Sequence, residues 1–210
     1  MLDTLSLATP GPVIPVMVIE RVQDAIPLAE ALLAGGVRVL EITLRTPAAL
    51  AAIEAIAKAI PSAIVGAGTV RNAEDARLAK QAGSAFVVSP GFSPSLVAAC
   101  ASLQMPLLPG VATASEVMAA HEAGLRFLKF FPAKNAGGPA MLQALGGPFF
   151  DVSFCPTGGI TAETAQSYLT LPNVKVCGGS WLTPKELVQT GQWAQITALA
   201  KAAQSLRSEP

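Results

Sequence analysis

Lys129 stands inside an otherwise apolar run, residues 127–131. Lysine side chains normally lie on exposed helix faces, so a lysine between four apolar residues is unusual. Burial disfavours the charged form of an amine because that form loses its hydration, and a neutral amine is a nucleophile that can attack a ketone. A second interpretation is a partly buried structural ion pair, with Glu41 as the partner.

A second group of polar side chains occurs in residues 37–44 and just after. Glu41, Thr43 and Arg45 alternate with apolar residues. Successive side chains of a strand point to opposite faces, so the apolar set should face helices and the polar set should face a site. Glu41 is then a candidate general acid and base. The planar guanidinium of Arg45 matches a carboxylate.

Two pairs of glycines follow the last two strand-like runs. Gly158-Gly159 comes after the seventh run, and Gly178-Gly179 comes after the eighth and precedes Ser180. Paired glycines let backbone N–H groups approach an anion closely, and many barrels bind phosphate at this location. Tight turns without a ligand are the alternative interpretation.

The elements that must position these groups form a repeating pattern of short apolar runs and alanine-rich helical stretches. The runs cover residues 13–19, 37–44, 63–68, 85–89, 107–109, 127–131, 152–155 and 174–177. The helical stretches lie near 23–34, 47–60, 72–82, 94–103, 114–123, 138–145, 162–169 and 184–206. Eight such units predict a (β/α)8 TIM barrel, an α/β fold with parallel strands.

We expect one domain over residues 1–210, with residues 1–12 as an N-terminal extension. The alternative is an open, doubly wound α/β domain, but no GxGxxG fingerprint follows the first run. In a barrel the active site lies where strand C-termini meet the following loops.

Composition limits the partners of this chain of 210 residues. Hydrophobic residues make up 51% and charged residues 13%, and the formal net charge is zero. We therefore expect no nucleic-acid partner and no membrane span. Three cysteines without a CxxC pair predict free thiols. Because the sequence has a single histidine, we expect no metal site. No secretory signal is recognised, so we expect a cytoplasmic protein.

Six segments resemble those of a known family. They are residues 40–46 (LEITLRT), 66–70 (GAGTV), 89–91 (SPG), 129–133 (KFFPA), 154–160 (FCPTGGI) and 178–181 (GGSW). Together they resemble the signature segments of the 2-keto-3-deoxy-6-phosphogluconate (KDPG) aldolase family, which overlaps with 4-hydroxy-2-oxoglutarate (KHG) aldolase. The similarity runs from about residue 13 to residue 187, in the order and at the spacing of the family.

The resemblance implies a class I (Schiff-base) aldolase, a lyase that needs no metal or other cofactor and forms pyruvate and glyceraldehyde 3-phosphate. It also implies a homotrimer acting in the Entner-Doudoroff pathway of carbohydrate metabolism. The implied Schiff-base lysine is Lys129, and Glu41 is the implied proton shuttle. The implied substrate-binding residues are Arg45 and Thr69 at the pyruvate carboxylate, Pro90 and Phe131 at the pocket wall, and Thr157, Gly158, Gly159, Gly179 and Ser180 around the rest of the substrate and its phosphate.

One segment departs from the family pattern. Lys134-Asn135 stands where the resemblance leads us to expect an acidic or small residue. This segment lies near the expected mouth, where it could alter substrate preference, although a solvated loop lysine is the plainer interpretation. Three other functions stay open at this point: KHG aldolase with the same lysine, a different phosphosugar barrel enzyme such as an epimerase or decarboxylase, and a non-catalytic phosphometabolite-binding barrel.

Overall fold

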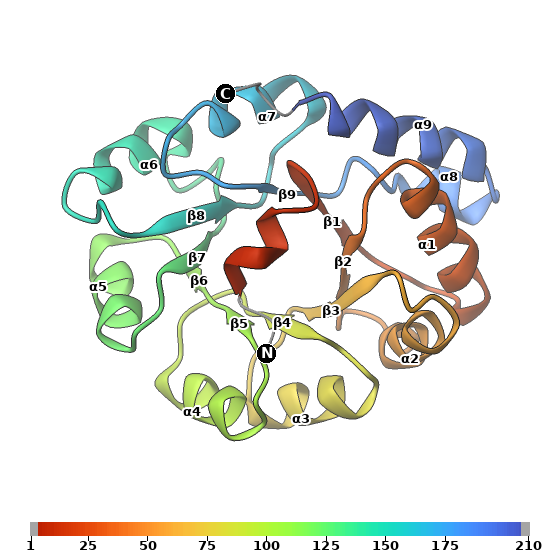
Figure 1. Ribbon diagram of the computed structural model, residues 1–210, viewed down its shortest axis with the longest axis horizontal. Coiled ribbons are helices and arrows are strands. Elements are labelled where there is room, and N and C mark those ends of the chain that lie inside the picture. The colour runs from red at the N-terminus through yellow and green to blue at the C-terminus, as the bar shows by residue number, and fades with distance from the viewer. Residues whose placement is uncertain (1–3, 207–210) are drawn as a thin grey trace.

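The computed structural model describes residues 4–206, and its parallel strands curl around a central axis with helices outside them (Figure 1). The strands are β1 (Val13–Met17), β2 (Val39–Thr43), β3 (Ile64–Gly68), β4 (Phe86–Val88), β5 (Leu107–Leu108), β6 (Gly110–Val111), β7 (Phe127–Phe130), β8 (Ser153–Pro156) and β9 (Cys177–Gly179). The α-helices are α1 (Ala25–Ala34), α2 (Ala49–Ala59), α3 (Ala73–Gln81), α4 (Pro94–Ser102), α5 (Ala114–Glu122), α6 (Gly138–Gly146), α7 (Ala162–Leu169), α8 (Lys185–Gln189) and α9 (Trp193–Gln204). Two 3-10 helices, η1 (Thr4–Ala8) and η2 (Val22–Asp24), precede β1 and α1.

The strands form two parallel sheets, one with the order β5-β4-β3-β2-β1-β9 and one with the order β6-β7-β8. The predicted parallel α/β architecture is therefore confirmed, whereas the ladder is divided where one closed barrel was expected. The expected fifth strand, residues 107–109, is two short strands on either side of Pro109. Proline has no N–H group to donate to a ladder, which accounts for the break.

The outward face of the strands is apolar and packs on the helices. Leu40 and Ile42 of β2 are fully buried in the same cluster as Ile53 and Ile56 of α2. The buried positions of α2 recur at the three- and four-residue spacing that places them on one face of a helix. Each large aliphatic side chain buried in this way contributes about 1.5–3 kcal/mol. The alternation predicted for residues 37–44 is thus confirmed on its apolar side.

The inward face changes from apolar to polar along β2 and β7. An apolar cluster fills the interior near the strand N-termini and consists of Leu7, Ala8, Ile14, Val39, Phe86, Val88, Leu108, Phe127, Cys155 and Val176. Two residues further along, the same faces carry Glu41 after Val39 and Lys129 after Phe127. The apolar cluster therefore forms a floor, and the polar groups stand above it at the C-terminal ends of the strands.

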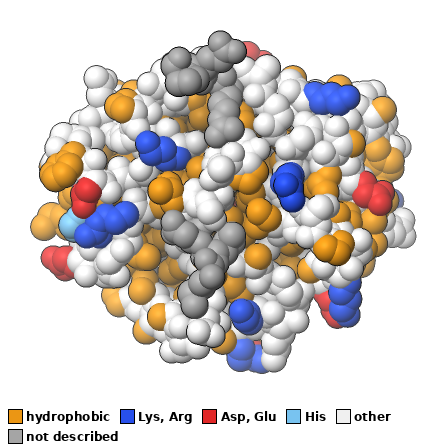
Figure 2. Space-filling view, viewed as in Figure 1, with side chains coloured by type: hydrophobic (Ala, Val, Ile, Leu, Met, Phe, Trp, Pro, Cys, Tyr) orange, Lys and Arg blue, Asp and Glu red, His pale blue; other side chains and the backbone are white. Residues whose placement is uncertain are grey.

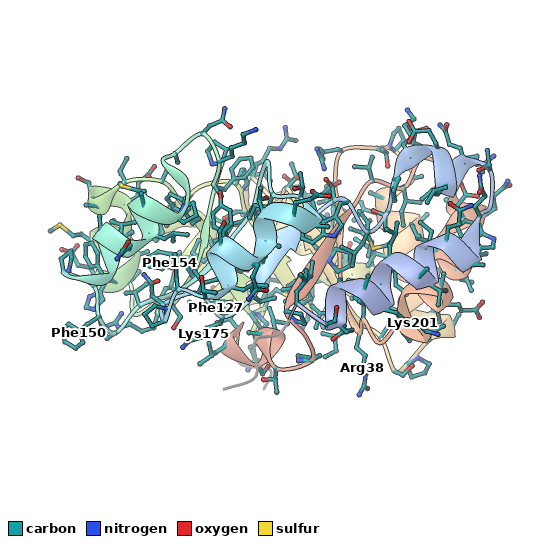
Figure 3. The ribbon with its side chains drawn as sticks, turned by 90° about the horizontal axis from the view of Figure 1, so that it is seen from above. Arg38, Phe127, Phe150, Phe154, Lys175 and Lys201 are labelled. Carbon is teal, nitrogen blue, oxygen red and sulfur yellow. The ribbon has the colours of Figure 1, made fainter. Side chains whose placement is uncertain are left out.

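The segment before β1 is part of this floor. Helix η1 lies across the centre of the ring of strands, as the red segment in Figure 1. Leu7 is 1% exposed and packs in the same cluster as Phe127, and Figure 3 shows η1 at the end of the molecule where Phe127 and Lys175 are labelled. Most of the expected N-terminal extension thus closes one end of the strand ring. Residues 1–3 lie outside the described residues.

The C-terminal part differs from its prediction. The long helix expected near 184–206 is two helices, α8 and α9, separated by a turn in which Gly191 has a φ of 67°. A positive φ of this kind ends a helix and favours glycine. Within residues 4–206 no helix is long and apolar enough to cross a bilayer. Acidic and basic side chains are scattered over the face seen in Figure 2 rather than gathered into one patch.

Short polar caps fix where several helices begin, and each cap follows a strand C-terminus. Asn72 accepts a hydrogen bond from the Asp75 N–H at the start of α3, and Ser93 accepts one from the Leu96 N–H at the start of α4. Thr113 and Glu116 form a reciprocal capping box at the start of α5. Caps of this kind satisfy N–H groups that a helix cannot satisfy internally, and they fix the ends of the loops between strands and helices.

The burial of η1 predicts a large effect of truncating Leu7. Leu7→Ala should destabilise the protein by about 2–5 kcal/mol, because it removes buried methyl groups and leaves a cavity in the floor. Leu5→Ala on the same helix, where the side chain is 45% exposed, should cost less than about 1 kcal/mol. Urea unfolding of both variants measures the difference. Equal, small losses would mean that η1 does not contribute to the core.

Candidate active site

Lys129 occupies the middle of β7 with its side chain on the inward face. It is 6% exposed, and its ammonium lies 5.1 Å from the centroid of the Phe131 ring. Its strand neighbours in register are Gly110 on β6 and Cys155 on β8. The adjacent residues Leu128 and Phe130 pack outward against helices. The predicted isolation of this amine on an apolar strand is therefore confirmed.

Glu41 lies beside Lys129, with 3.5 Å between the Glu41 Oε1 and Lys129 Nζ atoms. Both side chains are almost fully buried, and Oε1 accepts no hydrogen bond within the described residues. Gly68 provides the room for this carboxylate, since a Cβ atom at that position would lie 2.2 Å from Oε1. A buried oxygen without a partner, next to an amine, is an acceptor available to a ligand.

Arg45 is held at the rim by the same strand that carries Glu41. Thr43 donates a hydrogen bond to the Met17 carbonyl (2.9 Å) and accepts one from Arg45 Nε (3.1 Å). The exposed guanidinium of Arg45 makes no ion pair with any carboxylate of residues 4–206. Its remaining donors are free to bind an anion. Thr69 follows β3 directly and has a φ of 60°, which is strained for a β-branched residue. Backbone strain of this kind is most common at functional sites.

These groups share one cavity of about 280 Å³, and the structure places every residue predicted for the site around it. The lining residues are Val16, Glu41, Thr43, Arg45, Thr69, Pro90, Lys129, Phe131, Thr157, Gly158, Gly159, Ile160, Gly178, Gly179 and Ser180. The cavity is large enough for a small organic acid but smaller than a typical drug-sized site. It opens at the C-terminal ends of the strands, where a barrel site was expected.

One side of the cavity presents unsatisfied backbone N–H groups. Gly158 and Gly159 have φ values of 103° and 73°, and neither N–H donates to an acceptor within residues 4–206. The N–H of Ser180, opposite them, also has no acceptor among the described residues. N–H groups that converge on a concave surface form an anion-binding site. The left-handed backbone at residues 158 and 159 explains why glycine is needed there.

The second glycine pair, Gly178-Gly179, was expected to let N–H groups approach an anion, and its glycines also make room for other parts of the protein. A Cβ atom at Gly178 would lie 2.2 Å from Thr157 Oγ1, and one at Gly179 would lie 1.8 Å from the Trp181 ring. Neither residue has a positive φ. At both positions the lack of a side chain makes room for protein neighbours.

A larger cavity of about 550 Å³ adjoins the first and shares Val16 and Ser180 with it. Its charged side chains already pair with each other, Arg21 with Asp24 and Lys185 with Glu20. Neither Lys129 nor Glu41 reaches it. Chemistry therefore belongs to the smaller cavity. Within residues 4–206, no group of three or more His, Cys, Asp or Glu side chains is placed to hold a metal ion.

Comparison with known proteins identifies the family. Residues 5–199 match the family model "KDPG and KHG aldolase". The chain belongs to this aldolase family. It is 51% identical over 92% of its length to the 2-dehydro-3-deoxy-phosphogluconate aldolase of Pseudoalteromonas atlantica, which it covers to 90%. It is 49% identical over 94% of its length to the KHG/KDPG aldolase of Escherichia coli K12, which it covers to 93%.

A solved structure of the family is also very similar. The KDPG aldolase of Legionella pneumophila, with pyruvate captured at low pH as a covalent carbinolamine intermediate, superimposes with a TM-score of 0.95 at 45% identity. The similarity covers 97% of this chain and 98% of the other. The resemblance inferred from the six sequence segments is therefore confirmed at the level of the family.

The cavity includes four residues to which the sequence assigned no binding or catalytic role. Thr43 was expected to face the site, because it shares its strand face with Glu41 and Arg45. Gly178 belongs to the second glycine pair. Val16 and Ile160 carry no chemical signal, and only their positions at strand and loop ends place them at the wall.

Cys155 lies beside Lys129 on the neighbouring strand, but its thiol is expected to be unreactive. Burial raises the pKa of its thiol to about 12, and the nearby negative charge of Glu41 acts in the same direction. Burial also raises the pKa of Cys100 to about 11 and that of Cys177 well above its ordinary value. A thiol is nucleophilic as the thiolate, so all three should be inert near neutral pH.

The raised pKa values predict resistance to alkylation. Iodoacetamide at pH 8 should leave Cys100, Cys155 and Cys177 of the folded protein unmodified, and enzymatic activity should be unchanged. The same reagent should modify all three after unfolding in guanidinium chloride, which serves as the control. Mass spectrometry of the peptides measures the extent. Rapid modification of Cys155 in the folded state would contradict both its burial and its low reactivity.

Proposed function

We propose that this chain is a class I aldolase that cleaves 2-dehydro-3-deoxy-6-phosphogluconate to pyruvate and glyceraldehyde 3-phosphate, with Lys129 as the Schiff-base amine. The observation that carries the proposal is the buried pair of Lys129 and Glu41, 3.5 Å apart in a cavity. That cavity is also lined by the Arg45 guanidinium and by N–H groups, which have no ion pair and no acceptor, respectively, among the described residues. The named relatives and the carbinolamine structure support the same chemistry.

The first steps form a covalent intermediate on Lys129. Its neutral amine attacks the C2 ketone carbon to give a carbinolamine, which loses water to form an iminium ion. The amine becomes neutral when Nζ passes a proton to a neighbouring base, and Glu41 is the nearest carboxylate. The positively charged iminium then accepts electrons from the neighbouring carbon more readily than the neutral ketone would.

Cleavage follows when a base removes the proton of the C4 hydroxyl. The C3–C4 bond breaks, the aldehyde forms at C4, and the bonding electrons move into the iminium to give an enamine. Glu41 is our assignment for the base, directly or through one water molecule, and for the acid that returns a proton to C3. Hydrolysis of the resulting iminium releases pyruvate and restores the amine.

The two ends of the substrate take different partners in this proposal. Arg45 and Thr69 hold the carboxylate of the pyruvate half, with the arginine fork matching two oxygens. Gly158, Gly159 and Ser180 hold the phosphate through N–H groups and a hydroxyl. Pro90, Phe131, Thr157 and Gly179 complete the walls. Binding energy from the remote phosphate then positions the reacting carbons over Lys129.

KHG is a second substrate that the same site could cleave. It presents the same carboxylate and ketone to Arg45 and Lys129, and one relative carries both activities in its name. It lacks the phosphate, so it would leave the N–H groups of residues 158, 159 and 180 without their proposed ligand. We therefore propose the phosphorylated substrate as the preferred one.

We further propose that the two sheets close into one (β/α)8 barrel within a single domain. Bridges between Phe154 and Val174 and between Thr157 and Gly178 link β8 to the segment of β9, and the Lys129 N–H donates to the Pro109 carbonyl between β5 and β6. A homotrimer, a place in the Entner-Doudoroff pathway and a cytoplasmic location stay predictions. The three unpaired, buried cysteines suit a reducing compartment.

The assignment of Lys129 predicts a specific covalent adduct. Incubation with pyruvate and borohydride should reduce the iminium to a stable secondary amine on Lys129, which peptide mass spectrometry locates. Borohydride without pyruvate is the control. Glu41→Gln should form the adduct more slowly and cleave the substrate about 10²–10⁴-fold more slowly, because the variant loses the base that accepts the Nζ proton and the general acid and base of cleavage. An adduct on Lys134, with Lys129 unmodified, would refute the assignment.

The phosphate assignment predicts a selective effect of Ser180→Ala. Loss of a hydrogen bond to a charged group costs about 1.5–3 kcal/mol, so kcat/KM for the phosphorylated substrate should fall about 10- to 100-fold. The dephosphorylated counterpart, 2-keto-3-deoxygluconate, should be cleaved as by the parent. Ser180 is exposed, which makes a folding defect less of a concern than at Gly179, where any Cβ meets Trp181.

Ser102→Ala serves as the matched control, since Ser102 is exposed on α4 and bonds only to the Ala98 carbonyl. It should leave both substrates unaffected. Equal losses on the two substrates in Ser180→Ala would place the phosphate elsewhere.

A further inference from the structure

We propose that Lys134 supplies the positive charge for the substrate phosphate and is thereby a specificity-determining residue. This inference rests on the proposed function and adds to it a residue outside the cavity lining. The N–H groups of Gly158, Gly159 and Ser180 are neutral donors, whereas a phosphate ester carries nearly two negative charges at neutral pH. The cations inside the cavity, Lys129 and Arg45, are assigned to the ketone and the carboxylate.

The backbone fastens Lys134 to the proposed phosphate loop. The Ala133 N–H donates to the Thr157 carbonyl (2.8 Å), and the Lys134 N–H donates to the Gly158 carbonyl (3.1 Å). These bonds join the loop after β7 to the loop after β8, two residues on each side. Lys134 therefore keeps a fixed place relative to the N–H groups of residues 158 and 159.

The aliphatic part of the Lys134 side chain lies against Gly159. A Cβ atom built on Gly159 would lie 2.7 Å from Cβ, 3.0 Å from Cδ and 3.4 Å from Cγ of Lys134. The space beside Gly159 is thus occupied by the lysine stem, and the ammonium is two bonds beyond the Cδ atom that touches this space. The amine therefore extends from a stem that packs against Gly159, a residue of the cavity wall.

Among the described residues, the ammonium of Lys134 has no ion-pair partner. Lys134 is exposed, and within residues 4–206 no carboxylate lies within 4 Å of its amine. Lys185, which lines the adjoining cavity, is by contrast paired with Glu20 at 2.8 Å. A charged group on a stem that packs against the N–H loop, without a salt bridge of its own, suits an anionic group that arrives with the substrate.

The test compares Lys134→Met with the parent on KDPG and on 2-keto-3-deoxygluconate. Methionine keeps the aliphatic stem beside Gly159 and removes the charge. We expect kcat/KM for KDPG to fall about three- to tenfold, mainly through KM, because an exposed charge interacts modestly with a phosphate. The dephosphorylated substrate should be unaffected. The difference between variant and parent should shrink as salt is raised from about 10 to 500 mM.

Two further variants define the charge effect. Lys134→Arg should restore the parent values, and Lys134→Glu should lower kcat/KM for KDPG about 10- to 100-fold through repulsion. The matched control is Lys175→Met, since Lys175 is an exposed lysine at the opposite end of the molecule (Figure 3). It should leave both substrates unchanged at every salt concentration.

The outcomes separate this inference from the function on which it rests. Borohydride trapping of pyruvate on Lys129 is measured in every variant. If the adduct forms in Lys134→Met but kcat/KM is unchanged, or falls equally on both substrates, Lys134 does not select for phosphate and the inference is wrong. If the parent forms no adduct with pyruvate, the proposed function itself is wrong and this inference falls with it.

Discussion

The site is organised around two opposite charges held out of water, the ammonium of Lys129 and the carboxylate of Glu41, 3.5 Å apart. Removing either charge from water costs several kcal/mol, and their mutual attraction offsets that cost only where the surroundings hold them close. The surroundings are strands rather than loops, so the separation is set by ladder register. Glu41 lies opposite Gly66 on β3, and Lys129 lies opposite Gly110 on β6. Glycine two residues further along β3, at position 68, leaves the space that the carboxylate occupies. Because burial destabilises each charge, a pair placed in this way contributes little to the stability of the fold. For the same reason the pair is suited to exchange a proton with a substrate.

The floor beneath the pair makes this burial possible. Val39 and Phe127 precede the two charged residues by one inward-facing position, and both belong to the apolar cluster that η1 closes from below. Among the described residues, the amine and the carboxylate face the cavity at the loop end of the strands, which would hold the substrate. A ligand that fills the cavity excludes water and strengthens every electrostatic interaction in it. The short helix η1 thus packs in the floor beneath the charged pair.

Much of the arrangement of the site could be predicted from the sequence, because successive side chains of a strand alternate between its two faces. The polar alternation at 41, 43 and 45 and the isolated lysine at 129 fix which side chains face inward, whatever the exact strand ends. What the sequence could not supply depends on contacts between distant segments. The floor role of Leu7 requires knowing that residues 4–8 cross the strand ring, and no periodicity in that segment indicates it. The break at Pro109 was not expected, although a proline within a strand is a physical reason for one. The need for glycine at 179 comes from Trp181, a neighbour two residues away whose ring direction only the fold determines.

The two ends of the cavity differ in structure, since one consists of strand residues and the other of loop residues. The reacting end consists of strand residues whose neighbours on both sides are paired, so a change there alters the separation of the charges. The other end consists of loop residues, Gly158, Gly159 and Ser180, joined to the loop of Lys134 by two backbone hydrogen bonds. Those bonds use main-chain atoms only, so the side chain at 134 can differ without loosening the loops. If Lys134 binds the phosphate as we propose, substrate preference can change through an exposed charge while the buried pair keeps its geometry. Parallel strands followed by loops permit this separation, because the strands fix the positions of the reacting groups and the loops contact the rest of the ligand.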